Sequence, residues 1–303
     1  MPERFVLESL AMTTDNFHEK ARIELKHMGI SPQSLELMRA KEGIFLFAVH
    51  GKSDGHYILK YFENVVFRRE ILHYDQLKAI GVPTIPLIAK TDKALLMEDL
   101  NFSHAWRLGV KEDMDSPTIA RVLADWYQQL HTKGKSLATD PNLSWYSELN
   151  EFNPEGIALV KARTNSENAQ IWKQIDEKTE RITELIKRST KTLCFNDFYY
   201  VNLAVSRDEK RALMFDYNFL GLGFPAMDIS NVCASLSPRA GEAFREAYGA
   251  IDPAEEALFA VLAPITSLVI GAKRENLPGW FMEAWEELNQ PAFLNKLEGL
   301  NAL

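Results

Sequence analysis

Three residues with oxygen-bearing side chains stand at the ends of short apolar segments in the second half of the chain. Asp197 follows one such segment, Asn202 directly precedes the next, and Asp216 ends a third. Short strands that end together would let these side chains converge. Phosphoryl transfer needs a carboxylate that orients the attacking hydroxyl and accepts its proton, and it needs hard oxygen ligands that hold Mg²⁺ against the phosphates. The same residue types are common in turns, so alone they leave both interpretations open.

A lysine and a glutamate further upstream favour the phosphoryl-transfer interpretation. Lys60 lies among apolar residues in the strand-like segment 56–62, and Glu70 lies in a later segment with helical spacing. Kinase-type sites use a strand lysine to hold the nucleotide phosphates and a helix glutamate to orient that lysine. Lys60 could instead protect an edge strand, and Glu70 could face solvent. The order of all five residues along the chain favours the nucleotide site.

The first hundred residues predict a small mixed structure of one sheet and two helices. The apolar spacing indicates a leading helix, then three strands, a second helix and two more strands. A GKSDG turn signal separates the second strand from the third. The expected helices span residues 15–28 and 65–80, and the expected strands span residues 35–39, 44–49, 56–62, 86–89 and 94–97.

After residue 100 the pattern becomes mostly helical. Short strands at 192–195, 203–206 and 212–215 carry the oxygen-bearing residues, and the expected helices span 118–131, 155–163, 169–189, 240–248, 253–262 and 279–289. The chain is therefore predicted to be α+β, with a nucleotide-binding N-terminal lobe of residues 1–99 and a helical C-terminal lobe of residues 100–303 that holds the catalytic loop and the acceptor site.

Composition restricts the class of protein and its partners. The formal net charge of -8 argues against a nucleic-acid binder and weakly favours a neutral or cationic small-molecule partner. The N-terminus lacks a signal-peptide pattern, and the apolar run at 257–270 looks too short for a membrane span. Cys194 and Cys233 form no metal or disulfide pattern. A cytoplasmic protein that contacts no membrane is expected.

Taken together, these segments resemble the aminoglycoside phosphotransferase and choline kinase superfamily. The resemblance covers most of the chain, and CFNDFYYVN is particularly close to the catalytic-loop style of choline kinases. It implies a two-lobed, protein-kinase-like fold with a small antiparallel-sheet N-terminal lobe, and an ATP-dependent kinase acting on a small molecule. The matching segments are HYILK, RREILHYDQL, IGVPTIP, ALLMEDL, LADWYQQLH, CFNDFYYVN, MFDYN and GFPAMDIS.

The resemblance implies a nucleotide site in the N-terminal lobe. Lys60 would contact the α- and β-phosphates of ATP, and Glu70 would pair with Lys60. The backbone from Glu98 through Asp99 to Leu100 would meet the adenine.

The resemblance also implies roles for residues of the C-terminal lobe. Asp197 would be the catalytic base, and Asn202 and Asp216 would ligate Mg²⁺. Asp228 looks like the family's later structural aspartate. His131 stands at the predicted end of its helix, where a favourable interaction with the negative helix end is expected and catalysis is not.

Three features depart from the family pattern. Phe195 stands where the family usually has a histidine, which allows a looser site and reduced activity. Asn218 stands where an acidic residue is common, which weakens the case for a second metal ion. The segment 40–43, expected to cover the phosphates, contains one glycine and does not form a glycine-rich motif.

Three functional hypotheses follow. The leading one is a kinase that phosphorylates a hydroxyl of an aminoglycoside-, choline- or sugar-like molecule. The alternative is a catalytically weak or silent nucleotide-binding regulatory relative, against which the complete acidic set argues. A protein kinase is disfavoured because Tyr217 and Asn218, rather than Phe-Gly, follow Asp216, and no APE-like segment closes an activation loop. The pattern selects no particular acceptor, no preference between ATP and GTP, and no oligomeric state.

Overall fold

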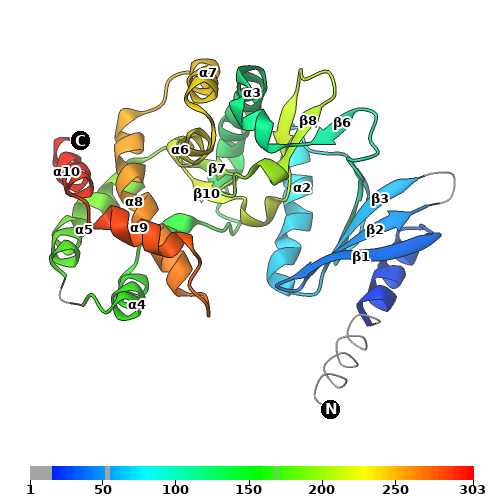
Figure 1. The fold of residues 1–303 in the computed structure, drawn as a ribbon, viewed down its shortest axis with the longest axis horizontal. Helices are drawn as coiled ribbons and strands as arrows, with labels where there is room; N and C mark the ends of the chain where they lie inside the picture. Colours follow the sequence, from blue (N-terminus) through cyan, green and yellow to red (C-terminus); the bar gives the residue numbers. More distant parts are fainter. Residues whose placement is uncertain (1–15, 52–54, 168) are drawn as a thin grey trace, which may run out of the picture. The chain divides into compact units, whose positions relative to one another are not determined.

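The computed structural model describes residues 16–51, 55–167 and 169–303. Residue 15 of the predicted first helix and most of the GKSDG turn lie outside the described residues. The chain forms two compact units, one of residues 1–113 with 199–218 and the other of residues 114–198 with 219–303 (Figure 1). The boundaries of these units differ from the predicted boundary between the lobes, which lies after residue 99. The division into lobes at residue 99 therefore stays a prediction.

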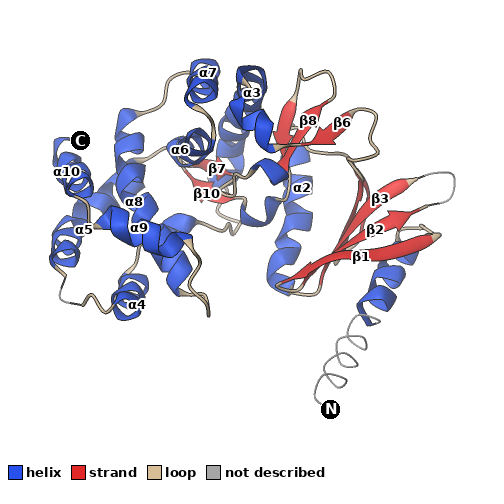
Figure 2. Cartoon of the chain, viewed as in Figure 1, coloured by secondary structure: helices blue, strands red, loops and turns tan. Residues whose placement is uncertain are grey.

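The first unit contains the predicted five-stranded antiparallel sheet, with β3 in its centre in the order β1-β2-β3-β5-β4. Its strands are β1 (Ser34–Lys41), β2 (Ile44–His50), β3 (His56–Phe62), β4 (Leu87–Lys90) and β5 (Ala94–Glu98). Residues 16–27 are helical, and Ala21 and Leu25 from this segment pack with apolar side chains of the sheet. As predicted, one helical segment joins β3 to β4: the 3₁₀ turn η1 (Val65–Arg68) followed by α2 (Arg69–Ala79) (Figure 2).

The connection between β1 and β2 is a tight hairpin, not an open loop. Glu42 and Gly43 both have positive φ angles, 53° and 82°, as in the two-residue turns that match the twist of paired strands. The Gly43 carbonyl accepts hydrogen bonds from the backbone N–H groups of Glu63 at 2.9 Å and Asn64 at 3.2 Å. A side chain at Gly43 would collide with Asn64, so this glycine allows the turn to pack closely against that segment.

A second antiparallel sheet in the first unit carries the predicted metal ligands. It has the order β6-β8-β9, formed by β6 (Trp106–Leu108), β8 (Leu203–Ser206) and β9 (Ala212–Met214). The 3₁₀ turn η4 (Tyr200–Asn202) leads directly into β8. Because Leu203 pairs with Met214, Asn202 and Asp216 lie at the same end of the β8–β9 hairpin.

The second unit is mostly helical, as predicted. Most of its helices begin with a proline in the first turn, where the missing N–H group would have no helical partner. The short strand β7 (Thr192–Cys194) pairs with β10 (Gly221–Gly223). The helices are α3 (Pro117–Ala138), α4 (Pro154–Thr164), α5 (Gln170–Arg188), α6 (Pro225–Ser235), α7 (Pro238–Tyr248), α8 (Pro253–Ala272), α9 (Trp280–Leu288) and α10 (Pro291–Gly299).

Several predicted boundaries in the second unit are wrong. Helix α3 continues past His131 to Ala138, so His131 lies inside the helix and its predicted place at a helix end is incorrect. Helix α8 continues through Pro264 to Ala272, whereas the prediction ended it at residue 262. The elements α6, α10 and β10 were not predicted, nor was β6 in the first unit.

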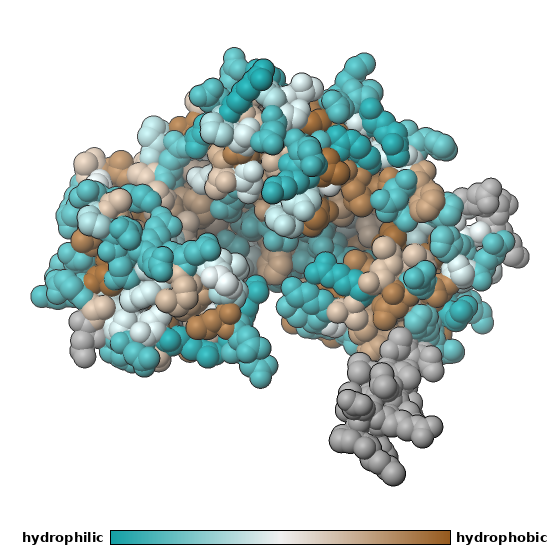
Figure 3. Space-filling model, viewed as in Figure 1, coloured by the Kyte–Doolittle hydropathy of each residue, from teal (hydrophilic) through white to brown (hydrophobic). Residues whose placement is uncertain are grey.

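Helix α8 also corrects the expectation that its apolar run is too short to span a membrane. Within the described part of the chain, it is the one helix long and apolar enough to do so, with a mean hydropathy of 1.6 over its best window. Most of that window is buried, and side chains of α4, α5, α6, α9 and α10 share its apolar core. Its apolar composition is therefore that of a core helix. On the face shown in Figure 3, hydrophobic residues form small patches separated by hydrophilic ones.

Candidate active site

The first unit brings three of the predicted site residues into direct contact. Lys60 lies in the central strand β3, where its backbone faces Leu46 of β2 and Leu95 of β5. Its Nζ donates to Glu70 Oε2 at 2.6 Å and to Asp216 Oδ1 at 2.8 Å. Lys60 is 4% exposed and Glu70 is fully buried, while the Asp216 side chain is 36% exposed. The alternative roles for Lys60 on an edge strand and Glu70 on a solvent face are therefore excluded.

The protonation equilibria of this trio reflect burial opposed by charge. Burial alone would lower the pKa of Lys60, but the carboxylates of Glu70 and Asp216 outweigh it and raise that pKa above its ordinary value. For Asp216, burial favours a higher pKa, and the neighbouring Lys60 ammonium lowers it overall. Burial raises the pKa of Glu70 to about 7, although Lys60 opposes the shift. A lysine held charged between two carboxylates is suited to binding an anion that approaches from the exposed Asp216 side.

A cavity of about 210 Å³ in the first unit opens beside this trio. Lys60, Glu70 and Asp216 line it together with Glu98, Asp99 and Leu100, the residues whose backbone is predicted to meet the adenine. A mostly apolar cavity that also contains charged side chains is suited to a ligand with an aromatic ring and a charged tail. The remaining lining residues are mostly apolar and come from both sheets: Met38, Leu46, Ile58, Tyr74, Ile85, Met97, Asn101, Leu108, Val201 and Phe215.

The segment 98–101 is fixed by the aspartate within it, Asp99. The backbone N–H of Asp99 donates to the His56 carbonyl at 3.1 Å, which extends the pairing of β5 with β3. Asp99 Oδ1 accepts from both the backbone and the side-chain nitrogen of Asn101, at 3.0 and 2.9 Å. The Asp99 carboxylate therefore shapes the turn after β5.

The end of the β8–β9 hairpin offers oxygen donors for a cation. The Asn202 carbonyl accepts from the backbone N–H of Phe215 at 2.9 Å, which fixes Asn202 beside the residue before Asp216. Asn218 is buried, and its Nδ2 donates to Asp216 Oδ1 at 2.7 Å. In the described structure the Oδ1 of Asn218 is buried without a hydrogen-bond partner. Carboxylate and amide oxygens are the donors Mg²⁺ prefers, so the donor set fits the predicted ion.

The predicted base, Asp197, lies in the second unit, in the loop that follows β7. The two residues before it are tied to a buried carboxylate. The backbone N–H groups of Phe195 and Asn196 donate to Asp228 Oδ2 at 2.7 Å and Oδ1 at 2.9 Å. Asn196 has a left-handed backbone with φ 65°, and its side chain donates to the Phe219 carbonyl at 2.9 Å. The chain therefore enters Asp197 in one defined conformation.

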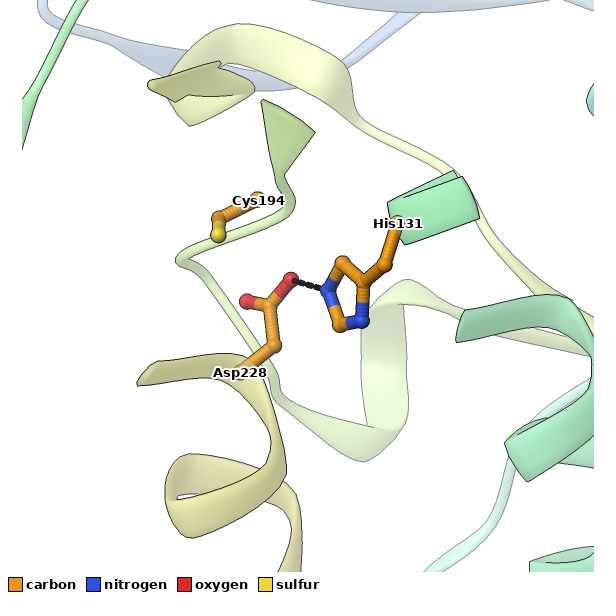
Figure 4. A group of neighbouring side chains, drawn as sticks. All are labelled: His131, Cys194 and Asp228. Carbon is orange, nitrogen blue, oxygen red and sulfur yellow. Dashed lines mark hydrogen bonds and ion pairs between the residues drawn. The ribbon is translucent and has the colours of Figure 1, made fainter. Parts of the chain in front are cut away.

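His131 completes the support of this loop from helix α3. Its Nε2 lies 2.9 Å from Asp228 Oδ2 and its Nδ1 lies 2.9 Å from the Tyr248 hydroxyl. Figure 4 shows the His131 ring directed at the Asp228 carboxylate, with Cys194 on the other side. Because a carboxylate can only accept, Nε2 is the donor. His131 is therefore a structural partner of Asp228, and its predicted interaction with a helix end is replaced by a side-chain hydrogen bond.

The ligand atoms of His131, Cys194 and Asp228 lie within 4.8 Å of one another, as in some metal sites. Each of these atoms already has a hydrogen-bond partner, since the Cys194 thiol donates to the Phe224 carbonyl at 3.4 Å. Burial raises the pKa of Cys194 well above its usual value, so the thiolate that would bind a metal is disfavoured. The cluster is a hydrogen-bonded support for the loop.

Phe195 is accommodated without loss of this support. Its side chain is fully buried, and its ring packs edge-on against Trp126, with centroids 6.0 Å apart. The hydrogen bond to Asp228 comes from the Phe195 backbone, so it does not depend on the side-chain type at this position.

Glu148, in the 3₁₀ turn η3 (Glu148–Glu151), is a candidate site residue that was not predicted from the sequence. Burial and the nearby carboxylates of Asp228 and Asp197 raise the pKa of Glu148 to about 7. The segment is anchored because Ser147 donates to the Leu222 carbonyl of β10 at 2.9 Å. A single glutamate in a turn carries no sequence signal, and only the fold brings it close to Asp197.

The comparisons agree with this fold. The profile of the phosphotransferase enzyme family matches residues 46–259. No curated protein matches the chain. Choline kinase LicA from Streptococcus pneumoniae is 14% identical with a TM-score of 0.64, and the match covers 94% of this chain and 100% of that one. A choline/ethanolamine kinase family protein from Mesorhizobium loti is 14% identical with a TM-score of 0.62, covering 96% and 99% of the two chains.

A third solved structure extends the likeness to antibiotic-modifying enzymes. The ADP-bound aminoglycoside phosphotransferase APH(2'')-Ib is 15% identical with a TM-score of 0.60, and the match covers 91% of this chain and 96% of that one. The protein-kinase-like α+β fold predicted from the sequence is thus confirmed. Since the family profile spans most of the chain, the protein belongs to the phosphotransferase enzyme family.

Proposed function

We propose that this protein transfers a phosphoryl group from ATP to a hydroxyl of a small molecule, with Mg²⁺ as its cofactor. The observation that carries the proposal is the buried contact of Lys60 with Glu70 and Asp216. Lys60 and Glu70 lie ten residues apart, and Asp216 lies 156 residues beyond Lys60. All three line the same mostly apolar cavity. A buried lysine between two carboxylates is costly to desolvate, so a binding function gives the best account of it.

The cavity supports a nucleotide as the ligand. In the proposed complex the apolar lining receives the base, and the backbone from Glu98 to Leu100 meets the adenine. Lys60 holds the phosphates, with Glu70 fixing the direction of its ammonium group. Asn202 and Asp216 hold Mg²⁺, which when bound neutralises charge on the phosphate oxygens.

The loop after β7 supplies the base. Asp197 orients the acceptor hydroxyl and accepts its proton, and the hydrogen bonds of Asp228 to the two preceding residues keep Asp197 in place. Such positioning is a main part of catalysis in phosphoryl transfer, because the protein contributes mainly by orienting the reactants and stabilising charge.

Two observations favour a cationic acceptor. Related structures are named as choline, ethanolamine and aminoglycoside kinases. Glu148 lies near Asp197 and has its pKa raised to about 7 by burial and by neighbouring carboxylates, and a positive group beside it would favour its ionised form. We infer a cytoplasmic enzyme whose partner is a small molecule rather than a nucleic acid or a membrane.

Calorimetry tests the nucleotide half of the proposal. ATP is titrated with and without Mg²⁺ into the natural protein, Asp216→Asn and the control Asp208→Asn. Asp208 lies in the turn of the same hairpin and accepts from Ser206. We expect Mg²⁺-dependent binding that weakens at least roughly tenfold in Asp216→Asn and is unchanged in the control. Binding that is indifferent to Mg²⁺ and to Asp216 would remove the proposal.

A phosphorylation screen tests the chemistry. With amine-bearing and neutral alcohols as acceptors, Asp197→Asn is expected to lower kcat by about 10²–10⁴ without weakening ATP binding. If the natural protein binds ATP with Mg²⁺ but phosphorylates no acceptor in a broad screen, the silent nucleotide-binding relative becomes the better description.

A further inference from the structure

The backbone of Asp216 adopts a conformation that is uncommon for residues other than glycine. Its φ angle is 68°, in the left-handed region that non-glycine residues seldom occupy. Such conformations persist only when surrounding contacts hold them. Besides the bonds that the Asp216 carboxylate accepts from Lys60 and Asn218, contacts on the residues next to Asp216 can hold this conformation.

Two side chains of helix α2 bind the two carbonyl groups that follow Asp216. Arg69 Nε donates to the Asn218 carbonyl at 2.7 Å, and His73 Nδ1 donates to the Tyr217 carbonyl at 2.7 Å. Residues four positions apart lie on the same face of a helix, so one face of α2 grips two successive peptide groups. The same helix carries Glu70, which holds Lys60 against the Asp216 carboxylate.

Tyr217 fixes the segment from the other direction. Its ring is fully buried and meets the Tyr74 ring of α2 edge-on, with centroids 4.8 Å apart. Its hydroxyl donates to the Met214 carbonyl at 2.6 Å, at the end of β9. The turn that starts at Asp216 is thus held by the side chain of Tyr217 and by the carbonyl groups of Tyr217 and Asn218. A change of Asp216 to a right-handed conformation would break these bonds.

From this geometry we infer that Arg69 and His73 are positioning residues that fix the backbone turn at Asp216 and thereby aim its carboxylate at the proposed metal ion. The inference rests on the proposed function for the role of Asp216. Both residues act through main-chain carbonyls, so neither needs to touch nucleotide or metal.

Matched variants separate the hydrogen bonds from simple packing. Asn places an amide nitrogen where His has Nδ1, and Gln places one where Arg has Nε. His73→Asn and Arg69→Gln thus keep the donors, whereas His73→Leu and Arg69→Met remove them. A role in packing alone would not distinguish the two members of each pair.

Two measurements decide the inference. Calorimetry of ATP binding with EDTA and with Mg²⁺ gives the gain in affinity due to the metal. The double variant His73→Leu/Arg69→Met is expected to show a roughly tenfold smaller gain and a nearly unchanged affinity in EDTA. The double variant His73→Asn/Arg69→Gln, which keeps both donors, should show the gain of the natural protein. Equal gains in all variants would overturn the inference.

Hydrogen exchange without any ligand gives the second measurement. Peptides covering residues 212–222 should exchange faster in His73→Leu and Arg69→Met than in the natural protein, and at the natural rate in His73→Asn and Arg69→Gln. If the natural protein fails to bind ATP, the proposed function is lost while this measurement still tests the turn. Unchanged exchange in the donor-removing variants would refute the role of Arg69 and His73.

Discussion

Replacing Asp228 with asparagine tests how the loop before Asp197 is held. The carboxylate is almost completely buried and accepts three hydrogen bonds, two from successive backbone N–H groups and one from His131. Asparagine has nearly the same shape but only one accepting oxygen. Whichever way its amide is turned, its NH₂ group faces at least one donor that had been satisfied.

The expected loss of stability follows from this count. A hydrogen bond to a charged group contributes about 1.5–3 kcal/mol, and a buried donor left without a partner costs about 1–3 kcal/mol. One bond is lost outright, and the others lose the charge that strengthened them. The variant Asp228→Asn should therefore reduce the free energy of unfolding by about 2–4 kcal/mol.

Tryptophan fluorescence during urea unfolding measures this change. Every tryptophan except Trp106 belongs to the second unit, so the signal reports on the unit that contains Asp228. In addition, kcat should fall by roughly 10²-fold because the loop that carries Asp197 shifts. The KM for ATP should stay the same, since the residues proposed to bind ATP belong to the first unit.

The control is Glu255→Gln, which alters another buried carboxylate of the same unit. Glu255 Oε1 accepts from the backbone N–H of Thr190 at 2.7 Å, in the segment before β7, whereas Asp228 binds the loop after β7. It should lose stability without losing kcat. A decrease below about 1 kcal/mol in Asp228→Asn would contradict the hydrogen-bond count, and a kcat equal to that of the control would contradict the positioning of Asp197.

Three further predictions concern charge. Lys60→Met should weaken ATP binding in calorimetry at least roughly tenfold. Because Glu70 then lacks its cation, the free energy of unfolding of this variant should fall relative to that of the natural protein as pH rises from about 5 to 8. The double variant Lys60→Met/Glu70→Gln should not show this loss. Glu148→Gln should raise KM roughly tenfold for an amine-bearing acceptor but not for a neutral one. In the natural protein, KM for the amine should fall as pH rises through about 7, because Glu148 becomes ionised. Equal effects on both acceptors would contradict the inferred cation contact. Burial lowers the pKa of His73 to about 4. The stability that the neutral His73 contributes is therefore complete above about pH 6.5 and falls by on the order of 3 kcal/mol as pH falls towards 4. Urea unfolding across this range should show the loss in the natural protein and not in His73→Asn.

The sheet and the placement of Lys60 could be predicted because the local signals were strong. Alternating apolar residues, turn glycines and a lysine inside an apolar strand all pointed to the same arrangement. The contacts between Lys60, Glu70 and Asp216 agree with the predicted order. The sequence could not show that Asp216 needs a left-handed turn, since that depends on Arg69 and His73 meeting carbonyls about 150 residues away.

The wrong helix ends have tertiary causes. Gly134 lowers helix propensity inside α3, yet a side chain there would crowd Leu193 of β7, so the glycine allows the strand to pack against the helix. Pro264 should end a helix by local rules, but it is buried in the core around α8, and packing outweighs the local cost. The strand β10 is too short and glycine-rich to give a strand pattern.

The division of the first unit between two stretches of chain has a consequence for synthesis on the ribosome. Residues 1–113 emerge well before residues 199–218, and the second unit's first stretch is made in between. During this interval the nascent chain has Lys60 and Glu70 but neither Asp216 nor the β8–β9 hairpin. The sheet of five strands can form early, because all of its strands precede residue 99. The pair of Lys60 with Asp216 closes a separation of 156 residues, so the proposed nucleotide pocket is completed late in translation. A chain that stalls before residue 199 would leave an open sheet for chaperones to protect.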